Sequence, residues 1–116
     1  MEKRRIAILG STGSIGRQTL DVIREHRDLF EVELLTCNNS FASLAMQARE
    51  FDANNVVICD ETRYKPLFDA LEGTDTKVFA GMKSVCELVA GDRVDLVVAA
   101  MVGFSGLAPT ISAIKA

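Results

Sequence analysis

The sequence has few of the features that mark extracellular, membrane-bound or nucleic-acid-binding proteins. Its 116 residues include three cysteines, two prolines, one tyrosine and no tryptophan. An odd number of widely spaced cysteines is neither a disulfide framework nor a zinc-ligand pattern, which favours reduced thiols in a cytoplasmic protein. No apolar run approaches the roughly 20 residues that span a membrane. The net charge of -3 provides no basic surface, so we expect neither nucleic acid nor a membrane as a partner.

The stretch that stands out is a strand pattern followed by three glycines. Residues 6–9 form an apolar run typical of a strand that is buried on both faces. Gly10, Gly13 and Gly16 follow at three-residue spacing, and a helical pattern opens at Ser14. Strand, glycine turn and helix in this order form the phosphate-binding end of a nucleotide-binding βαβ unit.

Each glycine has a distinct expected use. Gly10 would turn the chain sharply, Gly13 would let a pyrophosphate approach the backbone, and Gly16 would allow close packing of helix on strand. The alternative is a glycine turn that serves packing alone. A Walker loop is excluded because Gly-Lys-Ser/Thr does not follow at the required distance. The candidate cofactor-binding residues of this turn are Gly10, Ser11, Thr12, Gly13, Ser14, Ile15 and Gly16.

Short apolar runs and helical patterns alternate along the whole chain, and nothing marks a linker or repeat. Uninterrupted apolar strands that alternate with helices indicate an α/β fold with a parallel sheet. We therefore predict a Rossmann-like, doubly wound sheet in the order 4-3-2-1-5, with helices on both faces. The expected strands cover 6–9, 30–36, 55–59, 76–79 and 94–100, and four expected helices cover 14–24, 60–72, 82–90 and 110–115. A further helix, capped by Ser40 or Ser43, is expected through Phe51.

Helical spacing also predicts buried faces. Ile15, Leu20, Val22 and Ile23 are the expected buried face of the first helix. The last helix reaches Ala116 without a stop signal, so we expect a chain cut from a longer protein.

The segment after the second strand bears on the choice of nucleotide. Sites selective for NAD usually place Asp or Glu there to bind the ribose 2′-hydroxyl. Asn38, Asn39 and Ser40 stand at this position instead and favour NADP, although two asparagines are equally typical of a plain turn. Arg17 is the nearest cation in sequence, though a solvated helix residue is the simpler interpretation.

No catalytic constellation appears in this chain. Ala100 and Met101, where the fifth strand ends, are candidates for contact with the nicotinamide end of the cofactor, or else a tightly packed strand end. His26 lies alone in a charged stretch, and Cys37 has no histidine partner that would support a nucleophile. The acidic residues show no metal-ligand spacing.

Two motifs resemble one family. The run L-G-S-T-G-S-I-G at 9–16, continued by 18–23, closely resembles the opening of 1-deoxy-D-xylulose 5-phosphate reductoisomerases. The run A-A-M-V-G-F-S-G at 99–106 resembles a later motif of the same family. The resemblance implies an NADPH-dependent oxidoreductase of the non-mevalonate isoprenoid pathway. It would convert 1-deoxy-D-xylulose 5-phosphate into 2-C-methyl-D-erythritol 4-phosphate with magnesium or manganese, as a homodimer.

The resemblance also implies what this chain lacks. Thr12, Gly13, Ser14 and Ile15 match the family's pyrophosphate-binding residues, and 38–40 match the segment facing the 2′-phosphate, where many members carry Lys or Arg. The family's metal-binding acids, substrate-phosphate residues and flap lie beyond 116. We therefore expect residues 1–116 to bind NADPH without catalysing a reaction alone. The alternatives are the cofactor domain of another NADP-dependent reductase, of the semialdehyde dehydrogenase or dihydrodipicolinate reductase type, and a non-catalytic nucleotide sensor.

Overall fold

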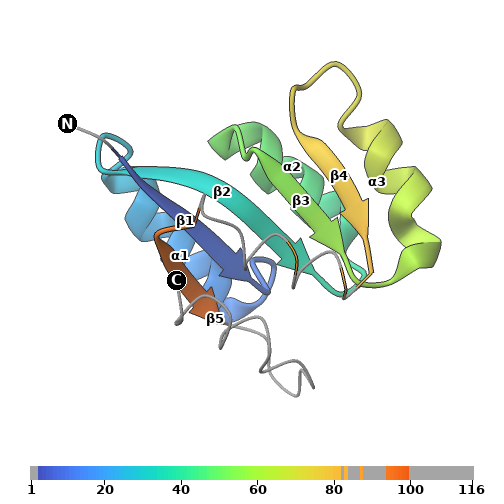
Figure 1. Cartoon of the computed structure of the whole chain (residues 1–116), viewed down its shortest axis with the longest axis horizontal. Coiled ribbons are helices and arrows are strands. Elements are labelled where there is room, and N and C mark those ends of the chain that lie inside the picture. The colour runs from blue at the N-terminus through green and yellow to red at the C-terminus, as the bar shows by residue number, and fades with distance from the viewer. Residues whose placement is uncertain (1–2, 82, 84–86, 88–93, 100–116) are drawn as a thin grey trace.

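The computed structural model describes residues 3–81, 83, 87 and 94–99 (Figure 1). None of the described helices is long and apolar enough to cross a membrane. In chain order the elements are β1 (Arg4–Leu9), α1 (Ser14–Glu25), β2 (Phe30–Cys37), α2 (Phe41–Phe51), β3 (Asn55–Ile58), the 3-10 turn η1 (Glu61–Arg63), α3 (Tyr64–Ala70), β4 (Lys77–Ala80) and β5 (Leu96–Ala99).

The five strands form one parallel sheet in the order β4-β3-β2-β1-β5. This is the predicted order. β1 occupies an inner position, paired with β2 on one side and β5 on the other, and Figure 1 shows all five arrowheads directed toward the same edge. The segments that follow β1, β2 and β3 therefore meet at the carboxyl edge of the sheet.

The two faces of the sheet bury different side chains. Ile6 and Ile8 of β1 belong to a large cluster that also contains buried residues of α1, α2 and α3, so these three helices cover one face. Ala7 and Leu9 point to a smaller cluster on the opposite face. Of the helix expected over 82–90, the described residues Lys83 and Glu87 are helical, and the helix expected over 110–115 lies outside the described residues.

The predicted buried face of α1 is half wrong. Leu20 and Ile23 are buried, each 2% exposed, whereas Ile15 is 53% and Val22 54% exposed. Ile15 and Val22 are seven residues apart and share one side of the helix. That side is turned away from the stripe of Gly16, Leu20 and Ile23 that faces the sheet. Apolar character alone therefore overestimated the width of the buried face.

The third helix does not begin directly at Asp60. A 3-10 turn comes first, in which the Arg63 amide donates to the Asp60 carbonyl at 3.0 Å. Pro66 explains the interruption, because it has no N–H to donate to the carbonyl of Thr62, as a continuous α-helix would require. In α3, which begins at Tyr64, Pro66 falls in the first turn, where no donor is needed.

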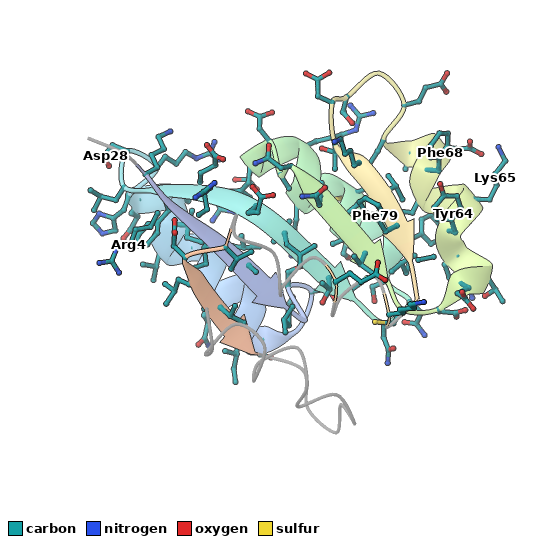
Figure 2. The ribbon with its side chains drawn as sticks, in the orientation of Figure 1. Arg4, Asp28, Tyr64, Lys65, Phe68 and Phe79 are labelled. Atoms are coloured by element: carbon teal, nitrogen blue, oxygen red, sulfur yellow. The ribbon has the colours of Figure 1, made fainter. Side chains whose placement is uncertain are left out.

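Two aromatic rings stack on α3. Tyr64 and Phe68 stack at 5.9 Å between ring centroids. Figure 2 shows both rings on α3, and shows Arg4 and Asp28 at the opposite end of the molecule. Phe79 of β4 packs on the other face of the sheet, against the cluster of Ala7 and Leu9. Arg4 begins β1 and Asp28 precedes β2, so these two mark the amino edge of the sheet.

Candidate functional site

The glycine turn between β1 and α1 is fixed to the end of β2. Gly10 has a φ of 87°, which glycine adopts without strain, and this reverses the chain at the end of β1. The amides of Gly10 and Ser11 both donate to the carbonyl oxygen of Thr36, at 3.0 and 2.9 Å. The Thr36 hydroxyl accepts a further bond from the Gly10 amide at 3.1 Å. The turn therefore has a defined position relative to the two central strands.

Gly16 lies where the helix touches the turn. A Cβ at this position would be 2.4 Å from the Gly10 carbonyl oxygen and 2.6 Å from the Ser11 Cα. Real Cβ atoms do not come this close to backbone. The predicted use of Gly16, close approach of helix and strand end, is confirmed.

The start of α1 presents backbone donors. Gly13 is the N-cap, with φ -80° and ψ 177°, and its amide donates to the Gly10 carbonyl at 3.2 Å. Within the described part of the chain, the amides of Thr12, Ser14 and Ile15 have no acceptor. The first turn carries no acidic residue. Unpaired amides and the positive end of a helix dipole at one place suit an anion such as a phosphate.

The predicted 2′-phosphate segment lies at the same edge. Asn38, Asn39 and Ser40 are exposed, directly after β2. Ser40 is the N-cap of α2, but its side chain makes no capping bond. This segment begins two residues after Thr36, whose carbonyl holds the glycine turn in place.

The Asp60 carboxylate lies at this edge, after β3. The Asp60 amide donates to the Asn38 carbonyl at 2.8 Å, which brings η1 beside the end of β2. The Asp60 carboxylate accepts bonds from the hydroxyl and amide of Thr62, at 2.6 and 3.0 Å. These bonds, the hydroxyl bond above all, hold the pKa of Asp60 below its usual value. Asp60 is thus the N-cap of η1.

The remaining predicted candidates differ in outcome. Ala100 and Met101 lie outside the described residues. The strand before them, β5, pairs with β1 as far as Ala99, which lies opposite Leu9. His26 is exposed at the end of α1, in agreement with its predicted solvated position. Arg17 lies with Ser14 on the wall of a groove of about 460 Å³ between α1 and α2. In the described residues there is no group of three or more His, Cys, Asp or Glu side chains that could hold a metal ion.

Cys37, the last residue of β2, is buried rather than reactive. Its side chain is 1% exposed, and burial raises the pKa of its thiol to about 12. At pH 8 this leaves about a thousandfold less thiolate than an ordinary cysteine has.

We therefore expect Cys37 in the folded protein to resist iodoacetamide at pH 8 for hours and to react within minutes in 8 M urea. Peptide mass spectrometry after timed quenching measures both rates. Cys59 is half-buried and is the internal comparison, because it is expected to react faster than Cys37. Alkylation of native Cys37 at the rate of the unfolded chain would contradict the assignment.

Sequence reasoning missed two residues of this site. Thr36 stands at the end of the second strand, before the segment that bears on the nucleotide, and nothing in the sequence indicates that its carbonyl holds the turn. Gln47 of α2 was not singled out, yet its amide contacts Ser11 at 2.7 and 2.9 Å. A single glutamine within a helix carries no pattern that points to a turn 36 residues away, so no signal in the sequence could have found it.

Comparison with known proteins points to one family. A family model described as 1-deoxy-D-xylulose 5-phosphate reductoisomerase matches residues 6–116. The 1-deoxy-D-xylulose 5-phosphate reductoisomerase of Bacteroides thetaiotaomicron is 52% identical over 115 residues, which are 99% of this chain and 30% of that protein. The enzyme of the same name from Saccharophagus degradans is 44% identical over 97% of this chain and 29% of its own length.

Solved structures that resemble this chain belong to the same family. A 1-deoxy-D-xylulose 5-phosphate reductoisomerase from Zymomonas mobilis in complex with NADPH superposes with a TM-score of 0.92 at 36% identity, over 98% of this chain and 30% of that one. A DOX-P reductoisomerase in complex with NADPH, fosmidomycin and magnesium gives 0.88 at 35% identity, over 95% and 27%. The chain thus spans about 30% of the length of the curated relatives it matches.

Proposed function

The chain belongs to the 1-deoxy-D-xylulose 5-phosphate reductoisomerase family, and from this premise we propose that residues 1–116 form the NADPH-binding domain of such an enzyme. The observation that carries the proposal is the set of unpaired amides at the start of α1. Thr12, Ser14 and Ile15 offer donors there, and Gly13 offers no side chain to obstruct a pyrophosphate. These residues fit the diphosphate of a dinucleotide.

The other parts of the cofactor follow from the parallel sheet. A dinucleotide that binds at the carboxyl edge places its adenosine half toward the end of β2 and its nicotinamide half toward the end of β5. We assign Asn38, Asn39 and Ser40 to the adenosine 2′-phosphate, and Ala100 and Met101 to the nicotinamide side. When bound, NADPH supplies a hydride to the substrate. This chain's own residues bind and orient the cofactor.

The activity of the whole protein is also a proposal. We propose that the full-length enzyme isomerises and reduces 1-deoxy-D-xylulose 5-phosphate to 2-C-methyl-D-erythritol 4-phosphate, with a divalent metal and as a homodimer. The names of the relatives support the reaction, and the solved complexes with NADPH and magnesium support the cofactors. The substrate and metal sites are assigned to residues beyond 116. The free thiols of Cys37 and Cys59 favour a reducing compartment, and we propose the cytoplasm.

Titration of the full-length protein with NADPH and with NADH tests the choice of cofactor. No carboxylate follows β2 in residues 38–40, and uncharged donors are available for a phosphate. We expect at least about tenfold tighter binding of NADPH, the equivalent of one or two charge-assisted hydrogen bonds. Isothermal calorimetry measures both constants. Equal constants would contradict the 2′-phosphate assignment, and the absence of NADPH binding would remove the proposed function itself.

Two arginines are candidates for the cation that faces the 2′-phosphate, and substitution of each can be compared. Arg17 stands at the first turn of α1, and Arg63 is an exposed residue that ends η1, the turn held beside Asn38. We expect Arg17→Ala or Arg63→Ala to weaken NADPH binding about tenfold and to leave NADH binding unchanged. Lys77→Ala is the control, because Lys77 begins β4 at the amino edge. Parallel losses for both nucleotides would show that the substituted arginine does not contact the 2′-phosphate.

A further inference from the structure

Gln47 makes a paired contact with the glycine turn. Its side-chain Nε2 donates to the Ser11 carbonyl oxygen at 2.9 Å. Its Oε1 accepts from the Ser11 hydroxyl at 2.7 Å. A carbonyl oxygen can only accept, so the nitrogen of the Gln47 amide must face it, and the orientation of the amide group is determined. Ser11 is fully buried, and its amide is also bonded, to the Thr36 carbonyl at 2.9 Å.

This contact is linked by one peptide unit to the unpaired amides at the start of α1, which are the proposed phosphate-binding donors. The carbonyl of Ser11 and the N–H of Thr12 belong to the same planar group and point in opposite directions. Gln47 therefore fixes the direction of the Thr12 N–H while it holds the Ser11 carbonyl. The Thr12 amide is one of the donors without an acceptor among the described residues. If the Ser11–Thr12 peptide rotated, its carbonyl oxygen would face the incoming phosphate instead.

We infer that Gln47 is a positioning residue for dinucleotide binding, which holds the Ser11–Thr12 peptide so that the Thr12 amide points at the pyrophosphate. This inference rests on the proposed function. Gln47 touches no cofactor atom in this scheme and acts through Ser11. Preorganisation of a donor removes the cost of ordering it when the ligand binds. The position of Gln47 on α2 also explains how a second helix, far along the chain, contributes to a site built at the start of α1.

The test compares two ligands on the full-length protein. NADPH contains the pyrophosphate, and adenosine 2′-phosphate does not. We expect Gln47→Met, which keeps the size of the side chain, to weaken NADPH binding about tenfold. Binding of adenosine 2′-phosphate stays within about twofold, because that ligand does not use the Thr12 amide. Amide exchange of Thr12, followed by NMR on labelled protein, becomes less protected by bound NADPH in the variant.

A matched control variant changes the residue next to Gln47 and keeps the contact itself. Met46→Leu, beside Gln47 on α2, changes a side chain that is 72% exposed and leaves both Gln47 bonds to Ser11 in place. We expect its NADPH affinity to stay within about twofold of the native value, since the peptide stays oriented. Thermal unfolding is measured for each variant before binding.

The possible results distinguish failure of the proposed function from failure of the inference about Gln47. Failure of the native protein to bind NADPH would remove the proposed function, and the inference with it. Native binding with an unchanged Gln47→Met would overturn the inference alone. Parallel loss of both ligands, or Gln47→Met and Gln47→Ala that do not fold, would also overturn it, because Gln47 would then support the fold and not the orientation of one peptide.

Discussion

Replacing Gly16 with alanine is expected to destabilise the protein by about 3 kcal/mol, although alanine is the better helix former. Its single added carbon would meet three backbone atoms: the Gly10 oxygen at 2.4 Å, the Ser11 Cα at 2.6 Å and the Ser11 carbonyl carbon at 2.8 Å. None of these is the end of a flexible side chain, so helix and turn must separate. The gain in helix propensity, about 1 kcal/mol, is too small to offset this.

The expected loss is measured by urea unfolding, as a lower midpoint at an unchanged slope. Gly73→Ala is the matched control. Gly73 has a φ of 87°, and among the described residues, its two chain neighbours aside, no atom lies within 4 Å of the place where a Cβ would stand, so alanine there meets backbone strain without a clash. We expect it to cost about 1–2 kcal/mol. If Gly16→Ala were no more destabilising than Gly73→Ala, the close packing of α1 on the turn would be contradicted.

Replacing Gly13 with valine is expected to abolish NADPH binding while the fold persists. The backbone of Gly13, at φ -80° and ψ 177°, is extended, and valine adopts this conformation readily. Glycine is the better N-cap, so we expect a stability loss of only about 1 kcal/mol. The added isopropyl group, however, would occupy the space in front of the amides of Thr12 and Ser14. We expect the dissociation constant for NADPH to rise at least about a hundredfold, close to 3 kcal/mol.

Calorimetric titration and circular dichroism on the same sample separate binding from folding. Met46→Val is the control for adding a β-branched residue, because Met46 is 72% exposed on α2. Gly13→Ala is expected to fall between the native protein and the valine variant. Undiminished binding by a folded Gly13→Val protein would mean that the pyrophosphate does not pass over this turn.

The order of the strands could be predicted because it follows from periods and connections within the chain. Continuous apolar strands predicted a sheet covered by helices, and right-handed crossovers then allow few orders. Gly16 could be predicted too, since a glycine in the first turn of α1 has few uses apart from close packing. The exposure of Ile15 and Val22 could not be predicted, because the sequence shows that they are apolar but does not show how far the sheet extends beneath the helix.

The sequence by itself determined the strand, turn and helix that form the candidate site, because each depends on residues within about ten positions of one another. The tertiary structure alone decided what holds that site in place. The Thr36 carbonyl fixes the amides of Gly10 and Ser11, and Gln47 fixes the peptide that follows. Local patterns encode the period and the ends of an element. They do not encode which polar group of a distant element faces a given backbone atom, since that depends on how the packed sheet brings α2 against the turn.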